Sequence, residues 1–304
     1  MKLGFLTAPF PETPLTGVAD WAASVDFEVL EIACWPRSTG ATRKYAGTSH
    51  IDVANLSDTQ ASEIKAEIAA KGLEISALGF YPNPLHPDPA VRSAAIDHLK
   101  AVIVATGKMG LPVTNTFCGG DASRNVDANW DEALKVWPDI VRFASDNGVK
   151  ITFENCPMIF SYDEWPAGHN IAYSPYVWRR ILEEWGDTVG LNFDPSHLVW
   201  LMIDQGHFIR EFGDHILHFQ AKDVMIDRTG LYERGSLSGG IGWQIPRIPG
   251  LGDAPWAEIF SALYQTGYDG PIIIEHEDKV FEGTDEKVKR GFLVARDILR
   301  PYVK

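Results

Sequence analysis

The sequence contains little cysteine, and the cysteines it has form no recognisable framework. Cys34, Cys118 and Cys156 are the three cysteines of the chain. An odd number without zinc-finger spacing excludes the disulfide pattern of small secreted domains and fits a reducing compartment. Each thiol lies at or just past the end of a predicted strand, so the three could line a pocket, although small buried thiols are common as packing.

Long hydrophobic runs are also missing. No segment reaches the roughly 18 apolar residues that a membrane span requires. The apolar stretch within residues 1–6 is followed by Pro9 and Pro11, so it is too short for a signal peptide and has no cleavage-site pattern. We therefore expect a cytoplasmic protein without a membrane partner.

Basic residues are outnumbered by acidic ones. The chain has 27 lysines and arginines against 41 aspartates and glutamates, which gives a net charge of -14. This excess repels polyphosphate backbones and argues against nucleic acid as a partner. No phosphate-cradling glycine motif and no low-complexity linker is evident. The expected partner is a small neutral or weakly charged molecule.

What the chain does have is a regular alternation of short strand-like runs with longer stretches of helical period. Such alternation indicates a parallel sheet with crossover helices. The expected strands are 3–7, 29–33, 74–79, 113–117, 150–154, 189–193, 216–221 and 272–275, and the clearest helical patterns are 57–71, 89–110, 126–147, 175–185, 256–266 and 284–299. Eight such units in 304 residues predict a single (β/α)8 TIM barrel that occupies residues 1–304 as one domain.

Two connections are longer than a barrel needs, at about residues 35–55 and 223–250. The first carries Trp35 and the second carries Arg234, together with other aromatic residues and arginines. Long loops at one face of a barrel commonly act as substrate lids. A contact between subunits would use a similar composition, so both interpretations stay open.

Four successive strands end in an oxygen-bearing side chain. Glu154 ends the fifth strand, Asp194 follows the sixth, Gln220 lies near the end of the seventh, and Glu275 ends the eighth. The C-terminal ends of barrel strands open on one face, so these side chains can converge. Three carboxylates and one amide form an all-oxygen set that suits Mn²⁺, with Mg²⁺ as the alternative, better than zinc or copper.

The motifs around these residues resemble those of the xylose isomerase-like TIM barrel superfamily, which includes sugar isomerases, ketose 3-epimerases, inosose dehydratases and endonuclease IV. They are Phe-Glu-Asn at 153–155, Asp-Pro-Ser-His at 194–197, His-Phe-Gln-Ala-Lys-Asp at 218–223, and Gly-Tyr-Asp-Gly at 267–270 leading into Ile-Glu-His-Glu. The resemblance extends over essentially the whole chain. It implies that one divalent cation is held by Glu154, Asp194, Gln220 and Glu275.

Gln220 departs from the pattern of that superfamily, in which the second histidine of His-x-His is the ligand. The chain keeps the first histidine as His218 and has an amide at the second position. A glutamine carbonyl oxygen can still coordinate, but it is neutral, so the site should be weaker for zinc. His218 is the alternative ligand. We favour Gln220 because we expect the two side chains to point to opposite sides of the strand.

Further side chains are expected around the cation. The resemblance implies that His197, three residues beyond Asp194, lies beside the substrate or the metal. Lys222 could neutralise an enolate or simply pair with Asp223. The expected sugar contacts come from strand ends and long loops, and they are Trp35, Tyr81, His86, Asn155 and Arg234.

A cation bound to a ketone and its neighbouring hydroxyl would acidify the C–H bond between them. In the resembling epimerases, two metal-binding glutamates exchange the proton on opposite faces of the sugar, and these correspond to Glu154 and Glu275. The primary hypothesis is therefore isomerisation or epimerisation of a sugar beside its ketone.

Other functions stay open. With a leaving group beta to the ketone, the same first step would make a lyase that acts on 3-keto-glycosides. The chain is similar in this respect to the large subunits of bacterial C-glycoside deglycosidases, which work with a small β-rich partner subunit. A non-catalytic sugar-binding barrel and a homo-oligomer are further alternatives. Endonuclease IV is disfavoured, because it needs three zinc ions and additional histidines.

Overall fold

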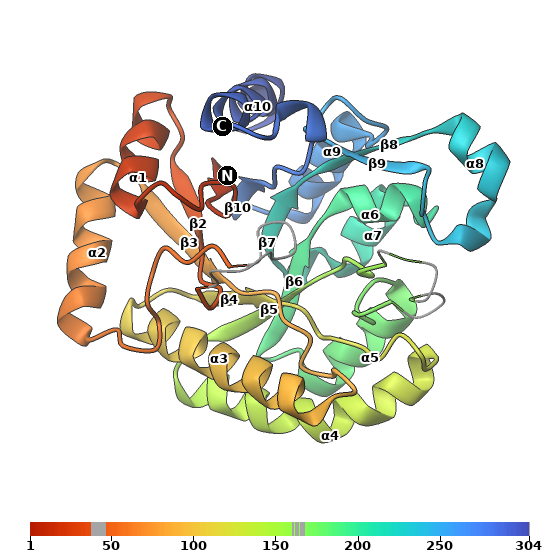
Figure 1. The fold of residues 1–304 in the computed structure, drawn as a ribbon, viewed down its shortest axis with the longest axis horizontal. Helices are drawn as coiled ribbons and strands as arrows, with labels where there is room; N and C mark the ends of the chain where they lie inside the picture. The colour runs from red at the N-terminus through yellow and green to blue at the C-terminus, as the bar shows by residue number, and fades with distance from the viewer. Residues whose placement is uncertain (38–46, 160, 162–163, 165–167, 304) are drawn as a thin grey trace.

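The structure, a computed structural model, describes residues 1–37, 47–159, 161, 164 and 168–303. Eight parallel strands close into a barrel in the order β1-β10-β7-β6-β5-β4-β3-β2 (Figure 1). The barrel strands are β1 Lys2–Leu6, β2 Val29–Ala33, β3 Glu74–Gly79, β4 Val113–Thr116, β5 Lys150–Glu154, β6 Val189–Phe193, β7 Ile216–Ala221 and β10 Pro271–Ile274. The predicted (β/α)8 TIM barrel is confirmed, and each predicted strand differs from the observed one by at most one residue at either end.

Helices surround the barrel and connect its strands (Figure 1). The α-helices of the described residues are α1 Leu15–Ser24, α2 Asp58–Ala70, α3 Pro89–Lys108, α4 Val126–Asp146, α5 Pro175–Trp185, α6 Pro195–Trp200, α7 Gln205–Phe212, α8 Arg228–Arg234, α9 Trp256–Thr266 and α10 Asp285–Leu299. Local sequence explains their limits and orientation. Ser57 and Gln60 form a capping box that starts α2. Along α4, the buried residues Trp130, Ala133 and Trp137 recur at helical spacing and turn one face to the barrel.

Four of these helices, α1, α6, α7 and α8, have no counterpart among the predicted elements. The shortest of them, α6, has six residues, too few to establish a helical period in the sequence. Its start is set by Asp194, whose side chain accepts a hydrogen bond from the Ser196 N–H at 2.8 Å. A predicted ligand position therefore also caps a helix.

The predicted long loop 223–250 contains regular structure that forms a projecting arm. The arm, residues 223–247, runs through β8 (Asp223–Ile226), α8, the 3-10 turn η3 (Ser236–Ser238) and β9 (Gln244–Arg247), and it lies at the edge of the molecule in Figure 1. β8 and β9 pair antiparallel as a two-stranded sheet of their own. The other predicted long loop, 35–55, falls partly outside the described residues, at 38–46.

The inner face of the barrel is divided between an apolar cluster and a polar layer. The cluster consists of Leu6, Ala8, Val29, Ala33 and Ile273. The inner polar layer consists of fully buried side chains, namely Glu31, Asn115, Thr152, Asn192, His218 and Gln220. Strand alternation produces this arrangement, since residues two apart on one strand face the same side.

The expectation that His218 and Gln220 point to opposite sides of β7 is wrong. A separation of two residues is one full strand period, so both side chains face the barrel interior. His218 is held there by Asn192 Oδ1, 2.9 Å from its Nδ1, and by Ser76 Oγ, 3.0 Å from its Nε2. Burial lowers the pKa of His218 to about 3, so the ring stays neutral near pH 7.

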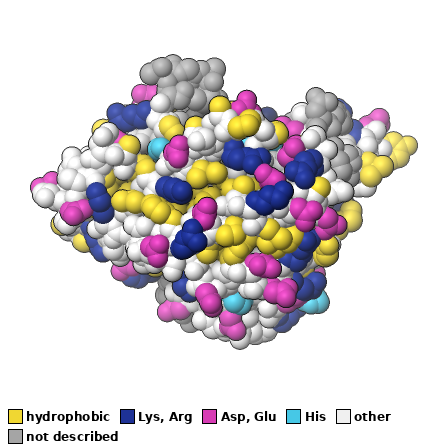
Figure 2. All heavy atoms as spheres, turned by 90° about the horizontal axis from the view of Figure 1, so that it is seen from below, with side chains coloured by type: hydrophobic (Ala, Val, Ile, Leu, Met, Phe, Trp, Pro, Cys, Tyr) yellow, Lys and Arg dark blue, Asp and Glu magenta, His cyan; other side chains and the backbone are white. Residues whose placement is uncertain are grey.

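The outside of the molecule is mixed in character. The face seen in Figure 2 intersperses acidic and basic side chains with hydrophobic ones. Among the described residues, no helix combines the length and the apolar character needed to cross a membrane.

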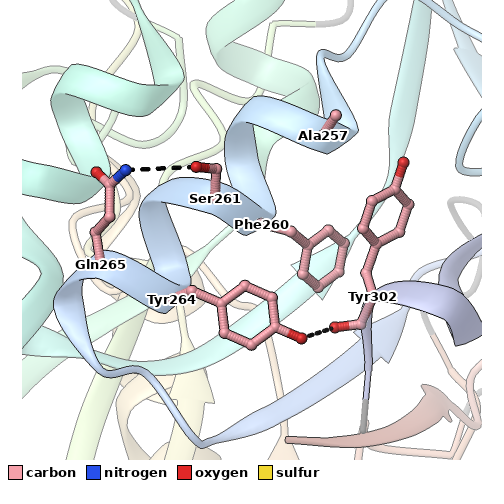
Figure 3. Close-up of a pocket in the computed structure, with 6 residues that line it drawn as sticks. All are labelled: Ala257, Phe260, Ser261, Tyr264, Gln265 and Tyr302. Carbon is pink, nitrogen blue, oxygen red and sulfur yellow. Dashed lines mark hydrogen bonds between the residues drawn. The ribbon is translucent and has the colours of Figure 1, made fainter.

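A shallow pocket lies on this outer shell, between α9 and the C-terminal turn η5 (Arg300–Tyr302). Figure 3 shows Tyr264 donating a hydrogen bond to the Tyr302 carbonyl, at 2.6 Å, with the Tyr302 ring stacked on Phe260. Its lining residues are Ala257, Phe260, Ser261, Tyr264, Gln265 and Tyr302. They include no carboxylate, histidine, lysine or cysteine.

Asp223 anchors the segment that returns from the arm to the barrel. Its buried carboxylate accepts hydrogen bonds from the N–H groups of Gly250 at 2.8 Å and Ala254 at 2.9 Å, and from the Trp256 indole at 2.9 Å. The N–H groups of Val224 and Gly252 also donate to it. The aspartate that ends the 218–223 motif is therefore a structural anchor.

We predict that Asp223→Ala lowers the free energy of unfolding by roughly 3 kcal/mol or more, because several buried donors lose their acceptor. Urea denaturation followed by circular dichroism measures this. Asp253→Ala is the matched control, since its exposed carboxylate accepts one N–H, from Ile226, and its loss should cost about 1 kcal/mol or less. Equal losses for the two variants would contradict the anchoring role.

Candidate active site

Three carboxylates from three different strands meet at one face of the barrel. Glu154 is the last residue of β5, Asp194 directly follows β6, and Glu275 directly follows β10. One oxygen from each lies within 4.8 Å of the other two. All three stand at the C-terminal ends of their strands, which is where TIM-barrel active sites lie.

Asn155 holds two of these strand ends together. Its Nδ2 donates to the Asp194 carbonyl at 2.7 Å, and its Oδ1 accepts from the Asp194 N–H at 2.7 Å. This pair of bonds fixes Glu154 beside Asp194. The side-chain amide of Asn155 is thus bonded to backbone, and its predicted contact with a sugar stays a prediction.

Lys222 lies among the carboxylates. Its Nζ is 2.7 Å from Glu275 Oε2, 2.9 Å from Asp194 Oδ2, 3.5 Å from Glu277 Oε2 and 3.9 Å from Glu154 Oε1. Burial alone would lower its pKa, but these charges raise the pKa of Lys222 well above its usual value. Lys222 was also predicted to pair with Asp223 as an alternative. The carboxylates that contact its ammonium are instead those of Glu154, Asp194, Glu275 and Glu277.

His197 contacts two of the same carboxylates. Its Nε2 is 3.2 Å from Asp194 Oδ2 and 3.4 Å from Glu154 Oε1. Burial opposes the charged ring, but Cys156 and Asp194 raise the pKa of His197 well above its usual value. Burial also opposes ionisation of Asp194, yet Lys222 and His197 hold the pKa of that carboxyl well below its usual range.

Glu275 behaves differently from Asp194. Burial raises the pKa of Glu275 well above its usual value, although Lys222 lowers it, and the charge of Glu154 adds to the rise. The two carboxyls contact the same ammonium, but Asp194 has a second cationic neighbour in His197. Unequal surroundings therefore give the cluster one strongly ionised carboxylate and one that favours its proton.

Gln220 lies on the inner face of β7, two residues before Lys222. Its Nε2 donates to Glu31 Oε2 at 3.1 Å and to Tyr81 Oη at 2.7 Å. Its Oε1 is buried and has no hydrogen-bond partner among the described residues. Burial raises the pKa of Glu31 to about 7.

These atoms fit a divalent cation. Four carboxylates surround Lys222 within 3.9 Å, so negative charge exceeds the positive charge of Lys222 and His197. The buried Gln220 Oε1 adds an acceptor without a donor. Carboxylate and amide oxygens are the donors that Mn²⁺ and Mg²⁺ prefer.

The remaining predicted sugar contacts occupy different places. Tyr81 joins the inner polar layer, because its hydroxyl donates to Glu31, and its ring lies 5.6 Å from that of Trp35. His86 makes local contacts, with Nδ1 accepting from the Asp88 N–H at 3.1 Å at the start of α3. Arg234 is exposed at the end of α8, on the arm.

Cys156, one of the three thiols expected to line a pocket, lies beside Glu154 and His197. Several residues of the site are absent from the predicted ligands and contacts, notably Glu31, Asn192 and Glu277. The strand period could have found two of them. Asn192 lies two residues before Asp194, and Glu277 two after Glu275, so each shares a face with a predicted ligand. Glu31 gave a different signal, a single carboxylate within the apolar strand β2.

Comparison with known proteins identifies the family of this barrel. The family model described as "Xylose isomerase-like TIM barrel" matches residues 19–298. The uncharacterized protein YfiH of Bacillus subtilis is 27% identical over 91% of this chain and 93% of its own length. The D-psicose 3-epimerase of Ruminiclostridium cellulolyticum is 22% identical, covering 83% of this chain and 75% of its own.

A solved structure agrees with these sequence matches. The 3-keto-D-glucoside 4-epimerase YcjR of E. coli superposes with a TM-score of 0.67 at 14% identity, over 99% of both chains. Because the family match runs from within α1 to within α10, the chain belongs to the xylose isomerase-like TIM barrel family.

Proposed function

We propose that this protein is a divalent-metal-dependent enzyme that removes a proton from the carbon beside a sugar ketone, and so isomerises or epimerises the sugar. In this proposal the cation is Mn²⁺, with Mg²⁺ as the alternative, and its ligands are Glu154, Asp194, Gln220 and Glu275. When bound, the cation supplies Lewis acidity to the ketone oxygen and the adjacent hydroxyl.

The observation that carries the proposal is the convergence of Glu154, Asp194 and Glu275 within 4.8 Å. Like charges in a buried cluster repel, so such a group is rare unless a cation or a reaction uses it. The epimerases among the relatives make proton transfer beside a ketone the favoured use.

Proton transfer is assigned to the two glutamates. β6 and β7 separate β5 from β10 in the barrel, so Glu154 and Glu275 approach the same point from different directions. One carboxylate takes the proton from one face of the sugar carbon, and the other carboxyl returns a proton to the opposite face.

Lys222 and His197 are proposed to control charge at the reacting carbon. The ammonium of Lys222, 2.7 Å from Glu275 Oε2, lies where it can offset negative charge that develops on a substrate oxygen. The ring of His197, with Nε2 3.2 Å from Asp194 Oδ2, orients that carboxylate.

Substrate binding is assigned to the predicted contacts near this face. Trp35 and Tyr81 offer a pair of neighbouring rings against which the apolar face of a sugar can lie. Asn155, His86 and Arg234 remain proposed contacts, with Arg234 reaching the sugar only if the arm closes over the barrel.

The proposal predicts that Glu154→Gln and Glu275→Gln each lower solvent deuterium incorporation into a ketose by roughly 100-fold or more, because each removes a proton carrier. The measurement is NMR of free ketoses incubated with the protein and Mn²⁺ in D₂O. Glu183→Gln, an exposed change on α5, is the control and should leave exchange unchanged. Full exchange in both glutamate variants would refute the assignment.

The same experiment separates the alternative functions. A 3-keto-glycoside is supplied in a parallel incubation. Release of its aglycone with exchange at the carbon beside the ketone would favour the β-eliminating lyase. Exchange without release favours the isomerase or epimerase. Binding of sugar without exchange in either incubation would favour a non-catalytic sugar-binding barrel.

Lys222 generates a separate prediction about stability. In EDTA-treated protein, Lys222→Met should lower the free energy of unfolding by roughly 3 kcal/mol, because the facing carboxylates lose their counter-charge. Mn²⁺ should restore most of the loss. Thermal unfolding with and without Mn²⁺ measures both effects. Lys135→Met, which removes an exposed pair with Glu132, should change stability by less than about 1 kcal/mol, and an equally small effect at Lys222 would contradict the prediction.

A further inference from the structure

The orientation of the Gln220 amide is determined by its two neighbours. The hydroxyl of Tyr81 donates its one hydrogen to Glu31 Oε1, so toward Gln220 the phenol oxygen can only accept. The other neighbour, Glu31 Oε2, is a carboxylate oxygen and also accepts. The end of the amide that faces both must therefore be the NH₂ group, and the carbonyl oxygen must point away from them.

The carbonyl oxygen of Gln220 is therefore turned away from Glu31 and Tyr81. Gln220 lies on β7 and Lys222 directly follows that strand, two residues further on, so we infer that both side chains point to the inner side of the barrel. Lys222 contacts the carboxylates from that face. Gln220 Oε1 is buried and has no hydrogen-bond partner among the described residues. Such an atom is costly to bury unless something that attracts it, such as a cation, lies beside it.

We propose that Glu31 is a positioning residue that presents Gln220 as an oxygen ligand and thereby makes the site select Mn²⁺ or Mg²⁺ over Zn²⁺. The inference rests on the cation site proposed above and adds what determines its metal preference. A histidine at position 220 held by the same carboxylate would present a nitrogen, which zinc accepts more readily. In this proposal the metal preference is determined by Glu31 and Gln220, and position 220 is where the chain has an amide in place of the second histidine of His-x-His.

Glu31→Gln tests this, because it keeps the size of the side chain and removes the obligate acceptor, which lets the Gln220 amide turn. Isothermal titration of EDTA-stripped protein with Mn²⁺ should show affinity reduced by roughly 10-fold or more. Glu28→Gln is the matched control. It lies just before β2, and its carboxylate contacts the Leu3 N–H and Arg300. Its Mn²⁺ affinity should equal that of the wild type, and thermal unfolding establishes that both variants fold.

A second measurement separates ligand positioning from a merely structural role. Gln220→His should raise the ratio of Zn²⁺ to Mn²⁺ affinity by about 10-fold or more, and adding Glu31→Gln should remove much of that gain. Either an unchanged Mn²⁺ affinity in Glu31→Gln or an unchanged ratio in Gln220→His overturns this inference and leaves the proposed proton transfer to its own test. A wild type that binds no Mn²⁺ overturns the inference and the proposed metal-dependent function together.

Discussion

The site depends on a buried ion cluster in which one ammonium faces several carboxylates. Lys222 lies within 3.9 Å of four of them. Without that charge, or a cation in its place, the carboxylates could not all ionise at such short separation. Burial already raises the pKa of Glu275 well above its usual value. The closed barrel brings these groups together, since each strand end is fixed by its neighbours on both sides.

Residues around the cluster keep the strand ends in register. Asn155 binds both backbone groups of Asp194, and Asp223 gathers N–H groups from the segment after the arm. At the base of the arm, Arg247 Nε donates to Asp278 Oδ2 at 2.8 Å, three residues beyond Glu275. This ion pair therefore joins the base of the arm to the segment that follows Glu275.

Part of the barrel interior, near the face that carries the carboxylates, is polar instead of apolar. Inner positions of TIM barrels are commonly filled by branched aliphatic side chains, whereas here Glu31, Asn192 and Gln220 are fully buried among polar partners. A buried polar group is stable only when its hydrogen bonds are satisfied. The inner polar layer meets this condition except at Gln220 Oε1, which has no hydrogen-bond partner among the described residues. Departures from ordinary core composition thus mark the functional end of the barrel.

The sequence by itself determined the strand limits, the limits of six of the ten described helices, and the position of Glu154, Asp194 and Glu275 at strand ends on one face, because strand and helix periods are local and parallel strand ends share a face. It could not determine which inner groups contact one another. Only the closed barrel decided that Lys222 faces the carboxylates, that Asp223 holds a distant loop, and that Glu31 on β2 reaches Gln220 on β7. These contacts join residues far apart in the chain, and their geometry follows from barrel closure, which no local pattern records.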